Sequence, residues 1–166
     1  DIKTKLVSII NTVSSKKMFD NKYPYRSSMS STMRESFKKL SVFLKKKFKP
    51  DLILEIGSND GSLIKYFKKN KALCVEPCKN LAKKTKKKGF KTYSEYWNMS
   101  LAKKIVSNYN KIDLIYSANT LSHIPNLDSV FKSISYVLSE NGVLIIEDPS
   151  LMECLKKTAY DQFYNE

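Results

Sequence analysis

Two acidic residues, each near the end of a short apolar run, are the residues of this sequence best suited to bind a charged small molecule. The first run, residues 52–56, contains Glu55 and leads into a turn that carries Gly57 and Gly61. The second run, residues 72–76, ends in Glu76, which Pro77 follows. Ligands of parallel sheets bind beyond the carboxyl ends of the strands, so we expect both acids to line one cleft.

The turn after the first run indicates which kind of ligand the cleft accepts. Its sequence is Gly57-Ser58-Asn59-Asp60-Gly61, whereas dinucleotide-binding folds use Gly-x-Gly-x-x-Gly to seat a pyrophosphate. Acidic side chains would repel a pyrophosphate but attract a cationic sulfonium or amino group. An acid at the end of the second strand is also placed to accept hydrogen bonds from a ribose diol. The pattern therefore favours S-adenosylmethionine over NAD.

A sheet must hold these residues in place, and the rest of the sequence predicts one. Apolar runs typical of strands buried on both faces alternate with segments of helical periodicity. Gly89 is expected to end one helix and Asn141-Gly142 another. The alternation predicts an α/β fold with a doubly wound, mainly parallel, Rossmann-like sheet. Strands are expected at 52–56, 72–76, 90–93, 112–118 and 143–147, and helices at 62–69, 80–88, 101–106, 127–138 and 151–160.

The first part of the chain is less regular and is expected to form an arm. A short helix is predicted at residues 6–13, followed by a polar loop and a serine-rich extended segment. Thr32 and Glu35 form a capping-box pattern at the start of a helix that is expected to end near Phe48. We therefore expect an N-terminal arm and substrate-side loop at residues 1–31 and a cofactor-binding domain at residues 32–166.

Several stretches together resemble a known family of enzymes. The chain is similar to class I S-adenosylmethionine-dependent methyltransferases, and more narrowly to the C-methyltransferases that act on nucleotide-linked keto-deoxysugars. The glycine turn is common to the whole class, whereas the first and last stretches are more specific to the sugar-methylating group. The matching stretches are residues 23–34, 54–61, 75–77, 118–125, 142–149 and 160–166.

The resemblance implies where the cofactor lies. The glycine turn would line its methionine part, Glu76 would hold its ribose, and Tyr96 and Trp97 would flank its adenine. For these two aromatic residues, packing under a loop is an alternative of similar weight. The expected cofactor-binding residues are Glu55, Gly57, Ser58, Asn59, Asp60, Gly61, Glu76, Pro77, Tyr96, Trp97, Ala118 and Asn119.

The reaction that the resemblance implies is methylation of a carbon next to a ketone through an enolate. This reaction needs a base near the carbon and a hydrogen-bond donor for the developing oxyanion. The candidates are His123, the only histidine of the chain, Tyr25 in the arm, and Tyr164 and Glu166 in the last matching stretch. Structural roles stay open for His123, at a helix start, and for Tyr25, against Pro24.

The sequence departs from the family pattern at both ends. In the family, a histidine follows the acid that Glu166 matches, a four-cysteine zinc module lies before the arm, and two further strands and a C-terminal domain come after the fifth strand. None of these features is present in the given sequence. We therefore expect it to be a piece of a longer enzyme, truncated after the fifth strand.

The formal net charge of +14 raises the question of nucleic-acid binding. Almost all of the excess is lysine, since Arg26 and Arg34 are the only arginines, and arginine is the residue suited to bidentate recognition. Lysine runs are more typical of solvated helix faces, so we expect no nucleic-acid partner. A non-catalytic cofactor-binding or RNA-binding module is one alternative, and an O- or N-methyltransferase acting on another small molecule is a second.

The composition excludes several other classes of protein. At 42% hydrophobic residues the chain is globular. It has no apolar run long enough to span a membrane and no apolar block of a signal peptide, so we expect a cytoplasmic protein without a membrane partner. Cys74, Cys78 and Cys154 are too few for a disulfide framework or a zinc site, and no metal is expected. The expected partner is a small-molecule substrate, a nucleotide-linked sugar.

Overall fold

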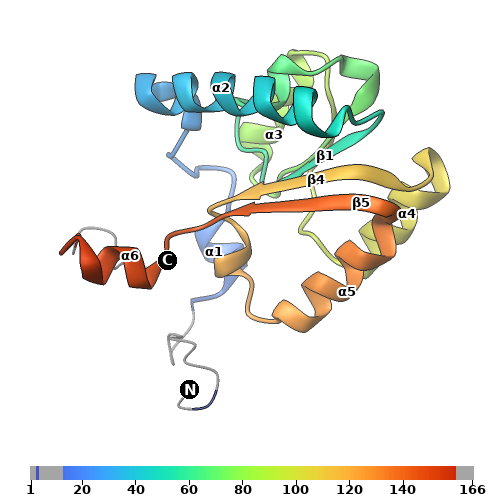
Figure 1. Ribbon diagram of the computed structural model, residues 1–166. Coiled ribbons are helices and arrows are strands. Elements are labelled where there is room, and N and C mark those ends of the chain that lie inside the picture. Colours follow the sequence, from blue (N-terminus) through green and yellow to red (C-terminus); the bar gives the residue numbers. More distant parts are fainter. Residues whose placement is uncertain (1–2, 4–12, 160–166) are drawn as a thin grey trace.

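The computed structural model describes residue 3 and residues 13–159, and these form one parallel sheet flanked by helices (Figure 1). The described strands are β1 (Ile53–Ile56), β2 (Ala72–Val75), β3 (Lys91–Tyr93), β4 (Ile112–Ala118) and β5 (Leu138–Glu147). Their order is β3-β2-β1-β4-β5, and all neighbours are parallel. The order reverses between β1 and β4, so ligands are expected beyond the carboxyl ends of these two strands. The predicted fold class is confirmed.

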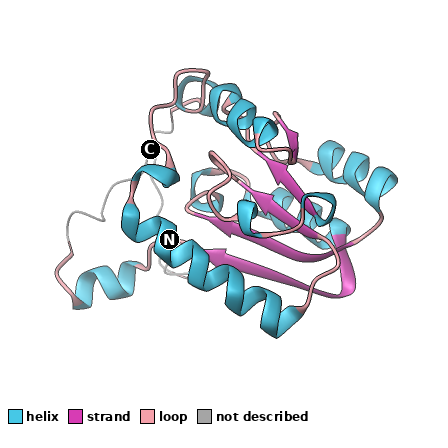
Figure 2. Cartoon of the chain, turned by 90° about the horizontal axis from the view of Figure 1, so that it is seen from above, coloured by secondary structure: helices cyan, strands magenta, loops and turns pink. Residues whose placement is uncertain are grey.

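Helices cover the two faces of the sheet (Figures 1 and 2). On one face lies α2 (Ser31–Phe48), whose Leu44 is fully buried in a cluster with Ile53 of β1. The other face is covered by α4 (Met99–Tyr109) and α5 (Leu127–Val137), which pack against β1, β2 and β4. β1 and β2 are therefore buried along their whole length, which explains why their sequences are continuous apolar runs.

The remaining elements are shorter. α3 (Lys79–Lys87) contacts β3. α1 (Ser15–Met18) lies in the arm, and α6 (Leu151–Lys156) follows β5. Four 3₁₀ turns among the described residues complete the chain: η1 (Ser27–Met29), η2 (Ile64–Tyr66), η3 (Lys69–Lys71) and η4 (Leu121–His123).

The helix predicted at residues 62–69 is wrong, because η2 and η3 take its place. Leu63 and Ile64 are adjacent and both fully buried, yet they pack into different clusters, Leu63 with Tyr116 and Ile64 with Ile53. A tight 3₁₀ turn brings both side chains to the sheet within a short connection. The local hydrophobic periodicity could not predict this turn, because the turn is imposed by packing against the sheet.

Other element ends differ from the predictions. The cap of α2 is Ser30, whose side chain accepts a hydrogen bond from the Met33 amide, and not Thr32. The predicted stop at Asn141-Gly142 is also wrong, because α5 ends at Val137 and β5 begins at once. The two residues lie in an irregularity of β5, where pairing moves from Ile112–Leu138 to Leu114–Val143.

Three further predictions concern the ends of the described chain. The helix predicted at residues 6–13 lies almost wholly outside the described residues, and α6 ends at Lys156 instead of near residue 160. β5 is one of the two edge strands of the described sheet, and Val143, Leu144 and Ile145 in it are only half-buried. The division into an arm at 1–31 and a domain at 32–166 stays a prediction.

Candidate active site

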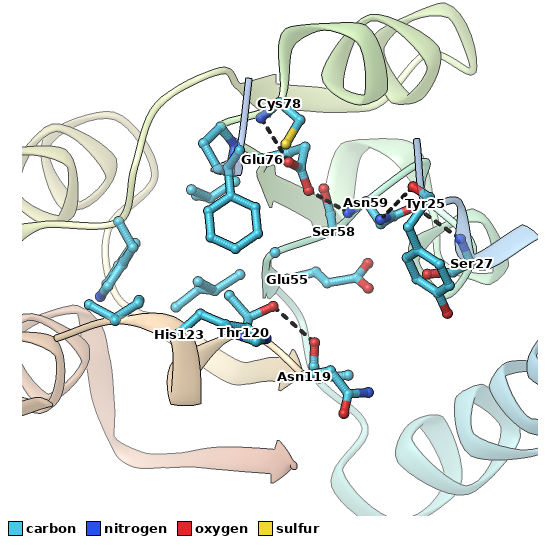
Figure 3. Close-up of a pocket in the computed structure, with 18 of the residues that line it drawn as sticks. Tyr25, Ser27, Glu55, Ser58, Asn59, Glu76, Cys78, Asn119, Thr120 and His123 are labelled. Atoms are coloured by element: carbon cyan, nitrogen blue, oxygen red, sulfur yellow. Dashed lines mark hydrogen bonds between the residues drawn. The ribbon is translucent and has the colours of Figure 1, made fainter. Parts of the chain in front are cut away.

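A cavity of about 560 Å³ lies at the carboxyl ends of β1, β2 and β4 (Figure 3). Its volume falls within the range of roughly 300–1,000 Å³ that is typical of small-molecule sites. Most of the residues predicted from the sequence to bind the cofactor or do chemistry line this one cavity. They are Tyr25, Glu55, Gly57, Ser58, Asn59, Glu76, Pro77, Tyr96, Trp97, Ala118, Asn119 and His123.

Two predicted residues of the turn, Asp60 and Gly61, are not among the residues that line the cavity. Asp60 is buried, and its Oδ1 accepts a 2.7 Å hydrogen bond from the Ser62 hydroxyl. Burial alone would raise the pKa of Asp60, but hydrogen bonds from Ser28 and Ser62 and the nearby Lys88 ammonium hold it below its usual value. Gly61 has a φ of +75°, and a Cβ there would lie 3.0 Å from Cγ2 of Thr85. Tyr164 and Glu166 lie outside the described residues.

The first glycine of the turn makes room for a neighbouring loop. Gly57 has a φ of +75°, and a Cβ on it would lie 2.0 Å from Oγ1 of Thr120, just after β4. The amides of Gly57 and Ser58 both donate to the Val75 carbonyl, which ties the turn to β2. The space beside Gly57 is therefore occupied by Thr120. The glycine is needed for close approach between the β1 and β4 connections.

Glu76 lies at the end of β2 with its carboxylate against the glycine turn. Its Oε2 accepts a 2.7 Å hydrogen bond from the Asn59 amide, and its Oε1 accepts one of 2.8 Å from the Cys78 amide (Figure 3). The residue is 4% exposed, and burial raises its pKa above the usual value, although the two amide hydrogen bonds oppose the rise. Each carboxylate oxygen accepts two hydrogen bonds, so capacity remains for a ligand in the cavity.

Glu55 lies at the end of β1 in a less polar environment. It is also 4% exposed, and Figure 3 shows its carboxyl pointing toward the side of the cavity where Tyr25 and Ser27 lie. Burial raises its pKa well above the usual value. A hydrogen bond from the Ile64 amide lowers the pKa of Glu55, and the charges of Glu76 and Asp60 raise it further.

Four buried polar atoms on cavity-lining residues find no hydrogen-bond partner within residues 3 and 13–159. They are Oε2 of Glu55, Oγ of Ser58, Nε1 of Trp97 and Nδ1 of His123. Unpaired buried polar atoms are rare in folded proteins and destabilising, so their gathering around one cavity fits a ligand with both donors and acceptors. No cluster of three or more potential metal-binding His, Cys, Asp or Glu side chains occurs in the described part of the chain.

The arm lies over the cavity and is held there by long-range hydrogen bonds that the sequence does not reveal. The Ser27 amide donates to Oδ1 of Asn59 at 3.0 Å, and Nδ2 of Asn59 donates to the Tyr25 carbonyl at 3.4 Å. The Tyr96 hydroxyl lies 3.1 Å from the carbonyls of both Ser15 and Phe19. Tyr96 therefore connects the cavity wall to the arm.

Sequence reasoning missed two residues beside His123. The ring of Phe19 meets the His123 ring edge-on with centroids 5.8 Å apart. Oδ1 of Asp148 accepts a 2.9 Å hydrogen bond from the Ser122 hydroxyl. Burial raises the pKa of Asp148, and the Ser122 hydrogen bond and the nearby His123 oppose this rise. Asp148 directly follows the end of the fifth predicted strand, and this position was a usable signal.

We expect Tyr96→Phe to loosen the arm without unfolding the sheet. The substitution removes one hydroxyl hydrogen bond, worth about 1 kcal/mol, so the opened arm should become about fivefold more populated. Trypsin cleavage after Lys16, Lys17 and Lys22, located by mass spectrometry, should accelerate by a similar factor. Tyr136→Phe, at a 40% exposed tyrosine on α5, is the matched control, and equal acceleration in both variants would contradict the assigned role.

A family model described as a methyltransferase domain matches residues 25–164. The chain belongs to the methyltransferase domain family. The match includes β1–β5, the glycine turn and the cavity-lining part of the arm from Tyr25 onward. The resemblance to methyltransferases seen in the sequence is thereby confirmed.

One similar curated protein is the C-methyltransferase NovU of Streptomyces niveus, with 28% identity over 118 residues. The similarity covers 70% of this chain and 28% of NovU, so the methyltransferase domain described here spans less than a third of that relative.

Solved methyltransferases share the fold. The plantazolicin methyltransferase BpumL in complex with a triazolic desmethylPZN analog and SAH has a TM-score of 0.60 and 16% identity, covering 84% of this chain and 55% of that one. An S-adenosylmethionine-dependent methyltransferase from Clostridium acetobutylicum has a TM-score of 0.50 and 24% identity, covering 66% and 49%. At such identities the likeness shows the Rossmann-like fold of the methyltransferase domain.

In the described residues, no helix combines the length and the apolar character that crossing a bilayer requires.

Proposed function

We propose that the cavity binds S-adenosylmethionine and that the protein transfers the methyl group to a carbon of a nucleotide-linked keto-sugar. One observation carries the cofactor part of the proposal. Glu55 and Glu76 are buried at the ends of the adjacent strands β1 and β2, and both line the same cavity. Buried carboxyl groups are unfavourable without cationic or hydrogen-bonding partners, and this cofactor supplies both.

The cavity residues offer a partner for each part of such a ligand. When bound, S-adenosylmethionine supplies an electrophilic methyl group on a positively charged sulfur. The Glu55 carboxyl offers an unpaired acceptor to a cationic group, and Glu76 retains acceptor capacity for ribose hydroxyls. Trp97 adds an unpaired indole N–H and an aromatic face. SAH, named with the structurally similar BpumL, belongs to the same class of ligand.

Two residues at the cavity are suited to the substrate. His123 has a buried Nδ1 without a partner among the described residues, so it offers a base for the proton next to the ketone. Tyr25, half-exposed on the arm, offers a hydroxyl to the oxyanion that develops when this proton leaves. The similarity to a protein named C-methyltransferase supports a carbon acceptor.

The test uses the complete protein that carries this sequence, ¹³C-methyl-labelled S-adenosylmethionine and a panel of nucleotide-linked keto-sugars. We expect saturable binding of the donor and a product whose methyl carbon has the chemical shift of a C–CH₃ group. In D₂O, the substrate should exchange the hydrogen next to its ketone, because an enolate forms. A label on oxygen or nitrogen, or no exchange, would favour the O- or N-methyltransferase alternative.

The same exchange tests His123. His123→Gln should keep donor binding and slow the hydrogen exchange, whereas Asp128→Asn, at the exposed start of α5, should change neither. Salt-sensitive binding of RNA without binding of the donor would instead support the non-catalytic alternative.

A further inference from the structure

Glu55 and Glu76 line one cavity and are equally buried, but their hydrogen bonds differ. Both are 4% exposed. Each oxygen of Glu76 accepts a backbone amide, at 2.7 and 2.8 Å. Oε2 of Glu55 is buried and has no partner among the described residues. Amide donors stabilise the ionised form of a carboxyl group, and burial without a donor stabilises the neutral form.

The charges that face Glu55 come from several elements. Glu76 at the end of β2 and Asp60 in the turn act against its ionisation, and Lys88, which follows α3, acts in favour. Lys88 is already engaged, because its ammonium donates to the Asp60 carbonyl. The Ile64 amide of η2 favours the ionised form, but burial is the largest influence and raises the pKa of Glu55. Burial raises the pKa of Glu76 as well, but both of its oxygens accept amides, whereas Oε2 of Glu55 has no partner among the described residues. Of these two neighbouring carboxyls, Glu55 is therefore the one that more readily stays neutral.

We infer that Glu55 carries a proton in the free protein and releases it to solvent when the cationic methyl donor binds. The inference rests on the proposed function, which supplies the cation. The unpaired Oε2 is the acceptor that a sulfonium or ammonium group entering the cavity would meet. A cation within a few ångströms favours the carboxylate, and the departing proton leaves one negative charge on Glu55 to pair with it.

The sign of the resulting pH dependence follows from the linkage between proton and ligand. The donor pairs with ionised Glu55, so below the free-protein pKa a proton must leave before the pair forms. Affinity should therefore fall as pH is lowered between the free and the bound pKa of Glu55, by up to about tenfold per pH unit. Above this window the affinity should no longer depend on Glu55.

Calorimetry measures the released proton directly. S-adenosylmethionine is titrated into the complete protein at a series of pH values, in buffers of different ionisation enthalpy, because release is expected only between the bound and the free pKa of Glu55. We expect the observed heat to change with buffer in proportion to about one released proton per bound donor. 5′-Methylthioadenosine, which has neither the sulfonium nor the ammonium charge, should bind without releasing a proton.

Two variants locate the proton. Glu55→Gln should bind the donor with little proton release, whereas Glu95→Gln, at an exposed glutamate, should behave like the unchanged protein. In protein with ¹³C-labelled glutamate carboxyls, one resonance should move from the acid to the carboxylate position on adding the donor, which tests the inference even if Glu55→Gln does not fold.

Different results would overturn the cofactor proposal and the proton-release inference. Absence of binding heat in every buffer would overturn the cofactor proposal and this inference with it. Binding whose heat is the same in all buffers would overturn only the inference, as would full proton release by Glu55→Gln or equal release with 5′-methylthioadenosine.

Discussion

Replacing Gly57 with alanine is expected to lower the free energy of unfolding by about 2–5 kcal/mol. A Cβ at this position would lie 2.0 Å from Oγ1 and 2.7 Å from Cγ2 of Thr120, so one of the two connections has to move. The φ of +75° adds the strain of a left-handed conformation. Thermal unfolding followed by circular dichroism should show a melting temperature lower by about 4–20 °C.

Gly89 provides the matched control. It also has a positive φ, of +91°, but a Cβ there would meet only the flexible end of the Lys69 side chain at 3.0 Å. Gly89→Ala should therefore show the backbone strain alone, about 1–2 kcal/mol. The double variant Gly57→Ala, Thr120→Gly should recover most of the difference between the two single variants. Equal destabilisation by Gly57→Ala and Gly89→Ala would contradict the close contact with Thr120.

Much of the fold was predictable because buried parallel strands have a strong sequence signature. Residues 112–118 were predicted as a strand and form β4 with the same bounds, and β1 and β2 differ from their predicted ranges by one residue at one end. The helix predicted at residues 62–69 was wrong because the structure there depends on distant contacts and not on a local pattern. Leu63 and Ile64 fit a helical pattern, but the clusters they join are made by residues distant in the sequence.

The residues of the candidate site also fall into those that the sequence predicts and those that it does not. Glu55, the glycine turn and Glu76 were predictable, since strand ends and turns are local features. The position of the arm was not, because it depends on contacts of Asn59 and Tyr96 with residues more than thirty positions away. Asp148 could have been noticed from its place after the fifth predicted strand, but its relation to Ser122 and His123 exists only after β4 and β5 pair.

Replacing Glu76 with alanine is expected to destabilise the protein by about 2–4 kcal/mol and to abolish donor binding at micromolar concentrations. The side chain holds the amides of Asn59 and Cys78, and each buried amide left unpaired costs about 1–3 kcal/mol. Losing the Asn59 contact also frees the turn whose Asn59 side chain accepts a hydrogen bond from the Ser27 amide at the cavity. Urea unfolding and calorimetry with S-adenosylmethionine measure the two effects separately.

Two controls distinguish the hydrogen bonds from the negative charge. Glu76→Gln keeps one acceptor oxygen, so it should satisfy one of the two amides and show about half of the loss in stability. Glu95→Ala removes an exposed carboxylate whose ion pair with Lys104 spans 3.1 Å, and it should change stability by no more than about 1 kcal/mol. If Glu76→Ala were no more destabilising than Glu95→Ala, the carboxylate of Glu76 would not be what holds the glycine turn in place.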